Sequence, residues 1–327
     1  MVVPEQVKKC VAFVYYRPRR QAAGLPDLTP AGTAFLLGSR QSVGDGFWCD
    51  VVTARHVIDG IRSRSADGKA YLRVNTNAGP SCLFETALDS WEPHPDPATD
   101  VAILPAVVLP WDQLDVLFYD ILGSLTDQAI AQNEIGVGDE VFMAGLFSNH
   151  HETDRCIPII RVGNIAAMPG EPVRTGLGHA PAYLIECRSI GGLSGSPVFV
   201  HLGLMRFVGG DIRLAKDVGA VGAIFYLLGL VHGHYDVHAA PDAFSEDAPS
   251  LKDETINMGI AIVVPIQRVV EFINTPERLE MRKKTEEKWA KGEYPTMDIA
   301  PGPGVEKEEF EKTLRKVSRP VAQRHDS

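Results

Sequence analysis

Three polar side chains that could cooperate in acyl transfer stand beside apolar, strand-like runs. His56 lies in the stretch TARHVIDG, Asp100 in ATDVAIL and Ser194 in GGLSGSPVF, in that order along the chain. A serine hydroxyl becomes a good nucleophile when a base takes its proton, and histidine is the base suited to neutral pH. A carboxylate can orient that base and stabilise its cationic form. The pattern therefore predicts Ser194 as nucleophile, His56 as general base and Asp100 as the group that orients the base.

The glycines around Ser194 answer a second requirement of this chemistry. Attack on a carbonyl group places negative charge on its oxygen, which preorganised backbone N–H groups stabilise. Glycine allows the tight turn that aims two such groups at one point, and Pro197 begins the next strand, where a missing donor is tolerated. We therefore predict an oxyanion hole formed by the amides of Gly192 and Ser194, in a reaction that needs no cofactor and no metal.

Short apolar segments separated by turn-forming residues recur through most of the chain. They include CVAFVYY, GTAFLLGS, FWCDVVTA, DEVFMAGLF, PAYLIEC and MGIAIVVP. Such a succession is typical of a mostly antiparallel all-β sandwich or barrel. Helical patterns are sparse. Residues 109–124 are expected to hold one helix, and IQRVVEFI (266–273) shows the spacing of an amphipathic helix.

The three polar stretches together resemble the motifs of the chymotrypsin-like serine peptidases. TARHVI is similar to the histidine motif of that family, TDVAIL to its aspartate motif and GLSGSPVF to its serine motif. GTAFLL resembles the strand that opens the first barrel, IGVGDEVFMAGLF the run that opens the second, and MGIAIVVPIQRVVEFI the last strand and C-terminal helix. The likeness covers roughly residues 8–273 and is strongest to the bacterial HtrA-like and glutamyl-endopeptidase-like members.

This resemblance implies an all-β fold of two six-stranded antiparallel β-barrels, with the active site in the cleft between them. The first barrel, expected over residues 8–130, would carry His56 and Asp100. The second, expected over residues 131–274, would carry Ser194 and end in the C-terminal helix. The function implied is that of a serine endopeptidase acting on protein or peptide substrates through an acyl-enzyme intermediate.

The same resemblance locates a substrate pocket just before Ser194, around residues 229–235 and at residues 259–261. It nominates five pocket residues: Arg188, Ser189, His232, Gly233 and His234. Glutamate-selective relatives use a serine and a histidine there, but the histidine of this chain is about one position out of register with theirs. We expect a small or apolar side chain before the scissile bond, with an acidic side chain as the alternative.

Residues 275–327 have a different composition, rich in opposite charges and poor in apolar residues. Thr275 and Pro276 fit the N-cap and first position of a helix, and APGPG further on interrupts it. We expect a charged helical or flexible appendage outside the core. A regulatory protein partner that docks through this tail is the alternative to a solvated tail.

Composition and charge exclude several kinds of partner. The net charge of -10 argues against binding to nucleic acid, whose partners usually carry a basic surface. No apolar run is long enough to span a membrane, and the first residues lack the apolar region of a signal peptide. The 5 cysteines are scattered and odd in number, which indicates a reducing compartment. We therefore expect a cytoplasmic protein with neither a nucleic-acid nor a membrane partner.

Three rival interpretations come from other classes of protein. An α/β-hydrolase elbow requires glycine where this chain has Ser196, and its serine precedes the acid and the histidine. His232, His234 and His238 have a strand spacing that zinc sites use, but no carboxylate or cysteine partner is identifiable. The rival that stays open is a peptidase fold serving as a partner-gated or inactive binding or sensor protein.

Overall fold

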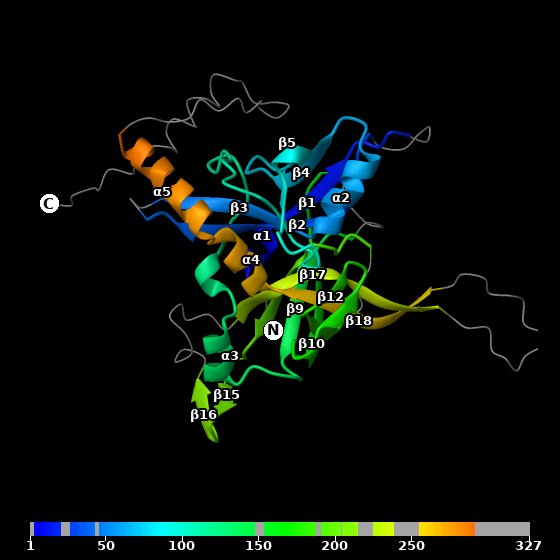
Figure 1. Ribbon diagram of the computed structural model, residues 1–327, viewed down its shortest axis with the longest axis vertical. Helices are drawn as coiled ribbons and strands as arrows, with labels where there is room; N and C mark the ends of the chain where they lie inside the picture. Colours follow the sequence, from blue (N-terminus) through cyan, green and yellow to red (C-terminus); the bar gives the residue numbers. More distant parts are fainter. Residues whose placement is uncertain are drawn as a thin grey trace, which may run out of the picture.

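Two mainly antiparallel β-sheets, one above the other in Figure 1, make up most of the fold. The computed structural model describes residues 3–20, 27–42, 46–147, 154–187, 191–203, 205–214, 225–238 and 255–291. Buried apolar side chains from both sheets belong to one continuous core. The predicted all-β, chymotrypsin-like architecture is confirmed.

The first sheet is built from the earlier strands of the chain. Its members are β1 (Val11–Tyr16), β2 (Thr29–Arg40), β3 (Phe47–Thr53), β4 (Lys69–Asn75), β5 (Ser81–Ala87), β6 (Glu92–Pro93), β7 (Ala102–Leu104) and β8 (Tyr119–Asp120). The pairing runs β5-β4-β1-β2-β3-β7-β6, and β8 joins β2 in parallel. This eight-stranded sheet is open, because its end strands β5 and β6 each pair with one neighbour, whereas the sequence predicts a closed six-stranded barrel.

The second sheet is the closed six-stranded barrel that the sequence predicts. Around the barrel, the strands are β10 (Ile159–Ala167), β13 (Tyr183–Glu186), β18 (Thr255–Pro265), β17 (Phe225–His238), β14 (Pro197–His201) and β9 (Glu140–Gly145). Phe199 stacks on Phe142 inside it, with ring centroids 5.3 Å apart. Tyr119 of the first sheet packs edge-on against the same Phe199, at 5.1 Å, so aromatic packing joins the two sheets.

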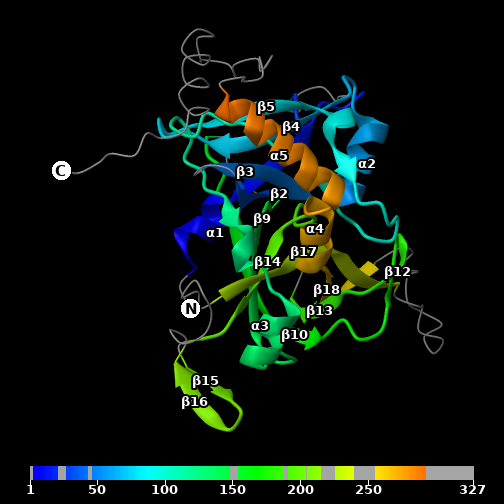
Figure 2. The ribbon, with the colours of Figure 1, turned by 60° about the vertical axis from the view of Figure 1, so that its left-hand side comes forward.

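Shorter elements connect or flank the strands of the two sheets. Two hairpins are formed by β11 (Val173–Thr175) with β12 (Gly178–Ala180), and by β15 (Met205–Val208) with β16 (Asp211–Leu214). The short helices are α1 (Glu5–Lys9), α2 (Arg55–Arg64), α3 (Asp127–Asn133) and the 3-10 turns η1 (Leu88–Ser90) and η2 (Ile121–Gly123). The β15–β16 hairpin projects from the end of the molecule opposite the first sheet in Figures 1 and 2.

The helix expected over residues 109–124 does not form. Leu114 and Val116 are buried two positions apart, which is the period of an extended chain rather than a helix. Their neighbours bond to other elements, since the N–H of Asp115 donates to the carbonyl of Asn75 (2.9 Å). Tertiary pairing therefore overrides the local pattern, and the segment ends in β8 and η2.

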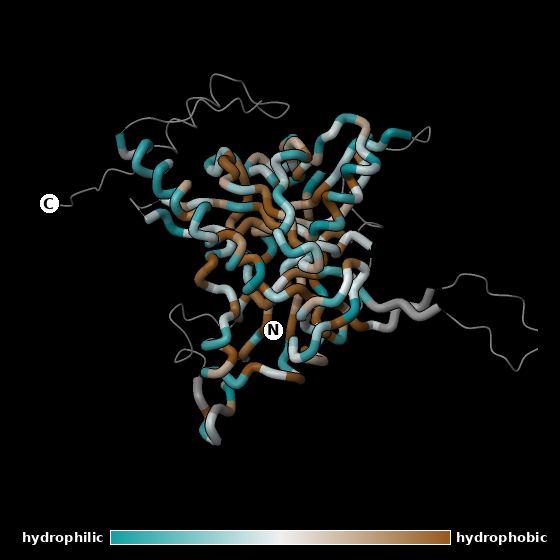
Figure 3. Tube along the Cα trace, in the orientation of Figure 1, coloured by the Kyte–Doolittle hydropathy of each residue, from teal (hydrophilic) through white to brown (hydrophobic). Residues whose placement is uncertain are grey.

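Two helices follow the last strand. The predicted amphipathic helix is confirmed as α4 (Ile266–Ile273), with Ile266, Val269 and Ile273 fully buried. The next helix, α5 (Pro276–Ala290), begins at the predicted proline and lies beside β3 of the first sheet (Figures 1 and 2). Figure 3 shows hydrophilic residues along much of α5, whereas hydrophobic residues gather in the sheets.

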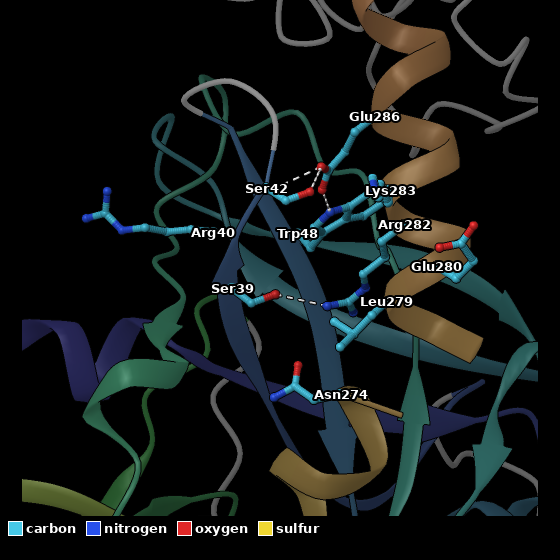
Figure 4. Close-up of a pocket in the computed structure, with 10 residues that line it drawn as sticks. All are labelled: Ser39, Arg40, Ser42, Trp48, Asn274, Leu279, Glu280, Arg282, Lys283 and Glu286. Atoms are coloured by element: carbon cyan, nitrogen blue, oxygen red, sulfur yellow. Dashed lines mark hydrogen bonds between the residues drawn. The ribbon is translucent and has the colours of Figure 1, made fainter. Parts of the chain in front are cut away.

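Polar contacts fix α5 to the first sheet, and Figure 4 shows those of Glu286 with Ser42 and Trp48 and that of Arg282 with Ser39. Arg282 donates hydrogen bonds to both carboxylate oxygens of Asp50 (2.9 and 2.6 Å), a side chain that is only 1% exposed. Glu286 accepts from the indole N–H of Trp48 (2.6 Å) and the backbone N–H of Ser42 (3.0 Å). The segment expected to lie outside the core thus begins with a helix that satisfies a buried carboxylate of the sheet.

Among the described residues, none of the helices has the length and apolar character of a membrane span.

Candidate active site

His56 sits in the first turn of α2, directly after β3. The first N–H groups of a helix lack partners within the helix, and here the N–H of His56 donates to Oδ1 of Asp100 (2.9 Å). Asp100 precedes β7, and Ala102 of that strand pairs with Thr53 at the end of β3. The pairing of β3 with β7 therefore brings the predicted aspartate beside the predicted histidine, although 44 residues separate them.

Asp100 holds the His56 ring as well as its backbone. Nδ1 of His56 lies 2.6 Å from Oδ2 of Asp100, so the carboxylate fixes the tautomer that carries a proton on Nδ1. In the neutral ring Nε2 is then the basic nitrogen. Burial would raise the pKa of Asp100, but hydrogen bonds from His232 and His56 outweigh it and the pKa lies below its usual value. The aspartate is thus a buried anion, with its side chain 2% exposed.

The Ser194 turn is clamped between the two sheets. The carbonyl of Ser194 accepts a hydrogen bond from the N–H of Thr33 in β2 (2.9 Å). The next residue, Gly195, donates to the carbonyl of Val231 in β17 (2.8 Å). Gly192 and Gly195 have φ values of 99° and 83°, a region open mainly to glycine, as the predicted tight turn requires.

This clamp brings the Ser194 turn against the segment that carries His56. A Cβ atom added at Gly32 would lie 3.0 Å from the Ser194 carbonyl and 2.9 Å from Cγ2 of Val57. One added at Gly195 would lie 3.0 Å from the N of Ala54. The Ser194 hydroxyl itself makes no hydrogen bond with any residue of the described ranges, His56 included. The structure therefore joins His56 to Asp100 and places the Ser194 backbone against Gly32, which also faces Val57 next to His56, without the serine–histidine contact.

Thr33 is a contributor to the site that the sequence analysis did not single out. It is fully buried, and its hydroxyl donates to the carbonyl of Gly192 (2.7 Å) while accepting from the N–H of Leu146 (2.9 Å). With the bond to Ser194, this one residue holds the turn at two points. The signal available in the sequence was a threonine inside the apolar stretch GTAFLL.

His232 binds Asp100, although the sequence analysis expects it in the substrate pocket. Its Nδ1 makes a hydrogen bond to Oδ2 of Asp100, the oxygen that also binds His56. Gly233 and His234 follow on β17, where they pair with Ile262 and Ala261. Arg188 and Ser189 lie outside the described residues. The pocket thus stays a prediction, supported by the pairing of 233–234 with β18 next to Gly259, whose carbonyl accepts from the N–H of Cys187 (2.8 Å).

The histidine pair and the aspartate also carry the donor atoms of a metal centre, all within 4.8 Å of one another. The 2.6 Å between Nδ1 of His56 and Oδ2 of Asp100 is the length of a charge-assisted hydrogen bond. Two ligands on a tetrahedral zinc ion with bonds of about 2.1 Å stand about 3.4 Å apart. The observed spacing therefore fits shared protons and would have to open to admit an ion.

Cysteine does not compete with serine for the role of nucleophile. All five cysteines are free thiols, and four of them are buried. Burial raises the pKa of Cys10 to about 12 and that of Cys82 to about 11. Their reactive thiolate forms are therefore scarce at neutral pH.

The architecture combines an open sheet beside the histidine and the aspartate with a closed six-stranded barrel that bears the serine turn. Hydrogen bonds from Thr33 to that turn join the two. The fold is chymotrypsin-like. His56 and Asp100 adjoin β3 and β7 of the first sheet, and Ser194 and His232 belong to the turn before β14 and to β17 of the closed barrel.

Comparisons with known proteins add two distant likenesses to this chymotrypsin-like fold. No family model matches the sequence, and no curated protein sequence matches it. The apo MamO protease domain from Magnetospirillum magneticum is 14% identical and has a TM-score of 0.46, with 83% of this chain and 98% of that chain covered. The inactive form of a serine-to-alanine mutant of Rv3671c from M. tuberculosis H37Rv is 14% identical, with a TM-score of 0.38 and coverage of 82% and 87%. The fold assignment rests on strand order and on the site.

Proposed function

We propose that the chain is a serine endopeptidase that hydrolyses peptide bonds through Ser194, His56 and Asp100. The observation that carries this proposal is the double hold of Asp100 on His56, through the backbone N–H at 2.9 Å and through Nδ1 at 2.6 Å. A histidine fixed in this way presents Nε2 as a base, next to the turn that bears the serine. Four of the five residues expected around the substrate, Arg188, Ser189, Gly233 and His234, would bear on specificity alone, whereas His232 contacts Asp100.

In the proposed reaction, the Ser194 oxygen bonds to the carbonyl carbon of the substrate and its proton passes to Nε2 of His56. Asp100 stabilises the resulting imidazolium, and the amides of Gly192 and Ser194 bind the oxyanion. The carbon–nitrogen bond then breaks as Nε2 returns the proton to the leaving amine. Water, deprotonated by the same nitrogen, hydrolyses the acyl-enzyme and restores the serine.

The first step requires a contact that substrate binding has to complete. Since the Ser194 hydroxyl has no hydrogen bond to His56, we propose that rotation about its χ1 angle supplies one when a peptide is bound. The Ser194 side chain is half-buried, and it lies in a turn between Gly192 and Gly195. Alignment of catalytic hydrogen bonds on binding is common in enzymes.

The same missing contact favours one second candidate, a partner-gated or inactive peptidase fold that binds other proteins. The two candidates are separated by incubating the wild-type chain and Ser194→Ala with a proteome-derived peptide library and sequencing the products. Cleavage by the wild type alone supports the endopeptidase and reports the residue preferred before the scissile bond, which we expect to be small or apolar. Equal cleavage by both chains contradicts the assignment of Ser194, and no cleavage by the folded wild type favours the binding protein.

A further inference from the structure

Two imidazoles share one oxygen of Asp100. Both His56 and His232 turn Nδ1 toward Oδ2, and their rings meet edge to face with centroids 5.6 Å apart. The carboxylate is 2% exposed, the His232 side chain 12% and the His56 side chain 37%. An oxygen that accepts from both Nδ1 atoms requires both neutral rings to carry their proton there.

A β-bulge aims His232 at this oxygen. Val231 pairs with Val263 and Gly233 with Ile262, so His232 is an extra residue on β17 opposite consecutive residues of β18. Such bulges redirect a side chain out of the regular alternation of a strand. Val231 also accepts the hydrogen bond of Gly195, so the bulge and the Ser194 turn share an anchor.

We propose that His232 is a positioning residue of the hydrolytic site, which holds Asp100 and competes with His56 for its negative charge. This inference rests on the proposed function for its effect on catalysis. A first proton added to either ring is balanced by Asp100. A second proton would place two cations beside a single anion, with ring centroids only 5.6 Å apart, so protonation of one ring opposes protonation of the other.

Two further ionisable groups lie close in sequence to His56 and His232, namely Arg55 and His234. Arg55, next to His56 on α2, pairs with Asp59 one turn further along the helix (Nε to Oδ2, 3.2 Å). His234 lies two residues beyond His232 on β17 and is half-buried. Asp100 and His56 are the titratable groups that the structure records in contact with His232 within the described ranges. The unit to test is therefore His56, Asp100 and His232.

The first measurement follows the ring nitrogens of this unit by ¹⁵N NMR in the Ser194→Ala chain, which does not depend on hydrolysis. We expect both rings to be protonated on Nδ1 at high pH and to titrate in two linked steps, each visible at both rings. In the His232→Asn variant, His56 should titrate in one step. Rings that titrate independently, or a proton on Nε2 of neutral His232, would overturn the proposal. The Ser194→Ala chain, which keeps both rings, gives this answer even if substitutions at 232 do not fold.

The second measurement is the pH profile of kcat/KM. Asparagine places an amide donor where His232 has Nδ1, but it takes up no proton. The fall of kcat/KM at low pH in His232→Asn should therefore follow one protonation instead of two. It should also occur at higher pH, because His56 no longer shares the charge of Asp100. His232→Ala, which also removes the donor, should lower kcat further, and asparagine should restore part of that loss. His201→Asn is the matched control, because His201 also faces a carboxylate, Glu140, at 3.5 Å in the same barrel.

The outcomes separate the two proposals. Superimposable wild-type and His232→Asn profiles in an active enzyme would overturn the role of His232 alone. Linked titration of the two rings in a chain with no hydrolytic activity would leave the shared carboxylate standing and contradict the proposed endopeptidase.

Discussion

The N–H of Thr33 donates a hydrogen bond of 2.9 Å to the carbonyl of Ser194, and this bond ties β2 of the first sheet to the turn of the proposed nucleophile. The Thr33 hydroxyl donates a hydrogen bond to the carbonyl of Gly192 in the same turn (2.7 Å). It accepts one from the N–H of Leu146, which directly follows β9 of the second sheet (2.9 Å). The proposed base and nucleophile come from different sheets. Their relative position therefore depends on contacts such as these.

Replacing Thr33 with valine should loosen this link. Valine keeps the shape but leaves the carbonyl of Gly192 and the N–H of Leu146 without their buried partner, so the free energy of unfolding should fall by about 1–3 kcal/mol. We expect kcat to fall more than KM changes, because the turn rather than substrate contact is affected. Thr33→Ser keeps the hydroxyl and should retain most of the activity. Valine and serine variants with equal kcat would contradict this role.

Gly195 should not tolerate a side chain. Its φ of 83° already costs about 1–3 kcal/mol for other residues, and an added Cβ would lie 2.2 Å from the carbonyl oxygen of Thr33 and 2.4 Å from Oγ1 of Thr53. Gly195→Ala should therefore lower the free energy of unfolding, measured in denaturant, by more than that amount. Gly136→Ala is the control, because a Cβ there meets nothing within 4 Å. Equal stability of the two variants would show that the turn is not confined as described.

Arg282 should stabilise the first sheet from α5. Removing one partner of a buried ion pair leaves the other charge uncompensated and costs about 3–5 kcal/mol, and Asp50 is 1% exposed. Arg282→Met keeps an apolar stem beside Trp48 while removing the charge, so the loss in the free energy of unfolding reports on Asp50. Lys284→Met removes an exposed charge paired with Glu280 and should change stability by less than about 1 kcal/mol.

A pair of truncations extends this test to the whole segment. A chain ending at residue 291 keeps α5 and should be as stable as the full chain if α5 makes the stabilising contacts. A chain ending at residue 274 exposes Asp50 and Trp48 and should be less stable by at least the amount lost in Arg282→Met. Equal stability of both truncated chains would mean that α5 adds nothing to the sheet.

The sequence was most informative where chemistry and local pattern coincide. His56, Asp100 and Ser194 each adjoin an apolar run, so their elements and their order could be predicted, and the amphipathic helix at 266–273 followed from its period. The helix expected at 109–124 was wrong, because pairing with distant backbone decided that segment.

Other features depend on contacts that a linear pattern does not carry. The bulge that turns His232 toward Asp100 is a shift of pairing between β17 and β18, and a pocket position was expected instead. Thr33 acts through partners more than a hundred residues away in sequence. The composition of α5 indicated a solvated helix, because its buried contacts are made by charged side chains rather than by an apolar face.

The most direct test of the proposed catalysis is labelling with a fluorophosphonate, which reacts covalently with a serine that a neighbouring base activates. The control is Ser196→Ala, since the Ser196 hydroxyl is buried without a hydrogen-bond partner among the described residues and lies in the same motif. Intact-mass analysis and peptide mapping should find one adduct, on Ser194, in the wild type and in Ser196→Ala, and none in Ser194→Ala or His56→Ala. A folded wild-type chain that gains no adduct, or an adduct that persists in Ser194→Ala, would contradict the assignment.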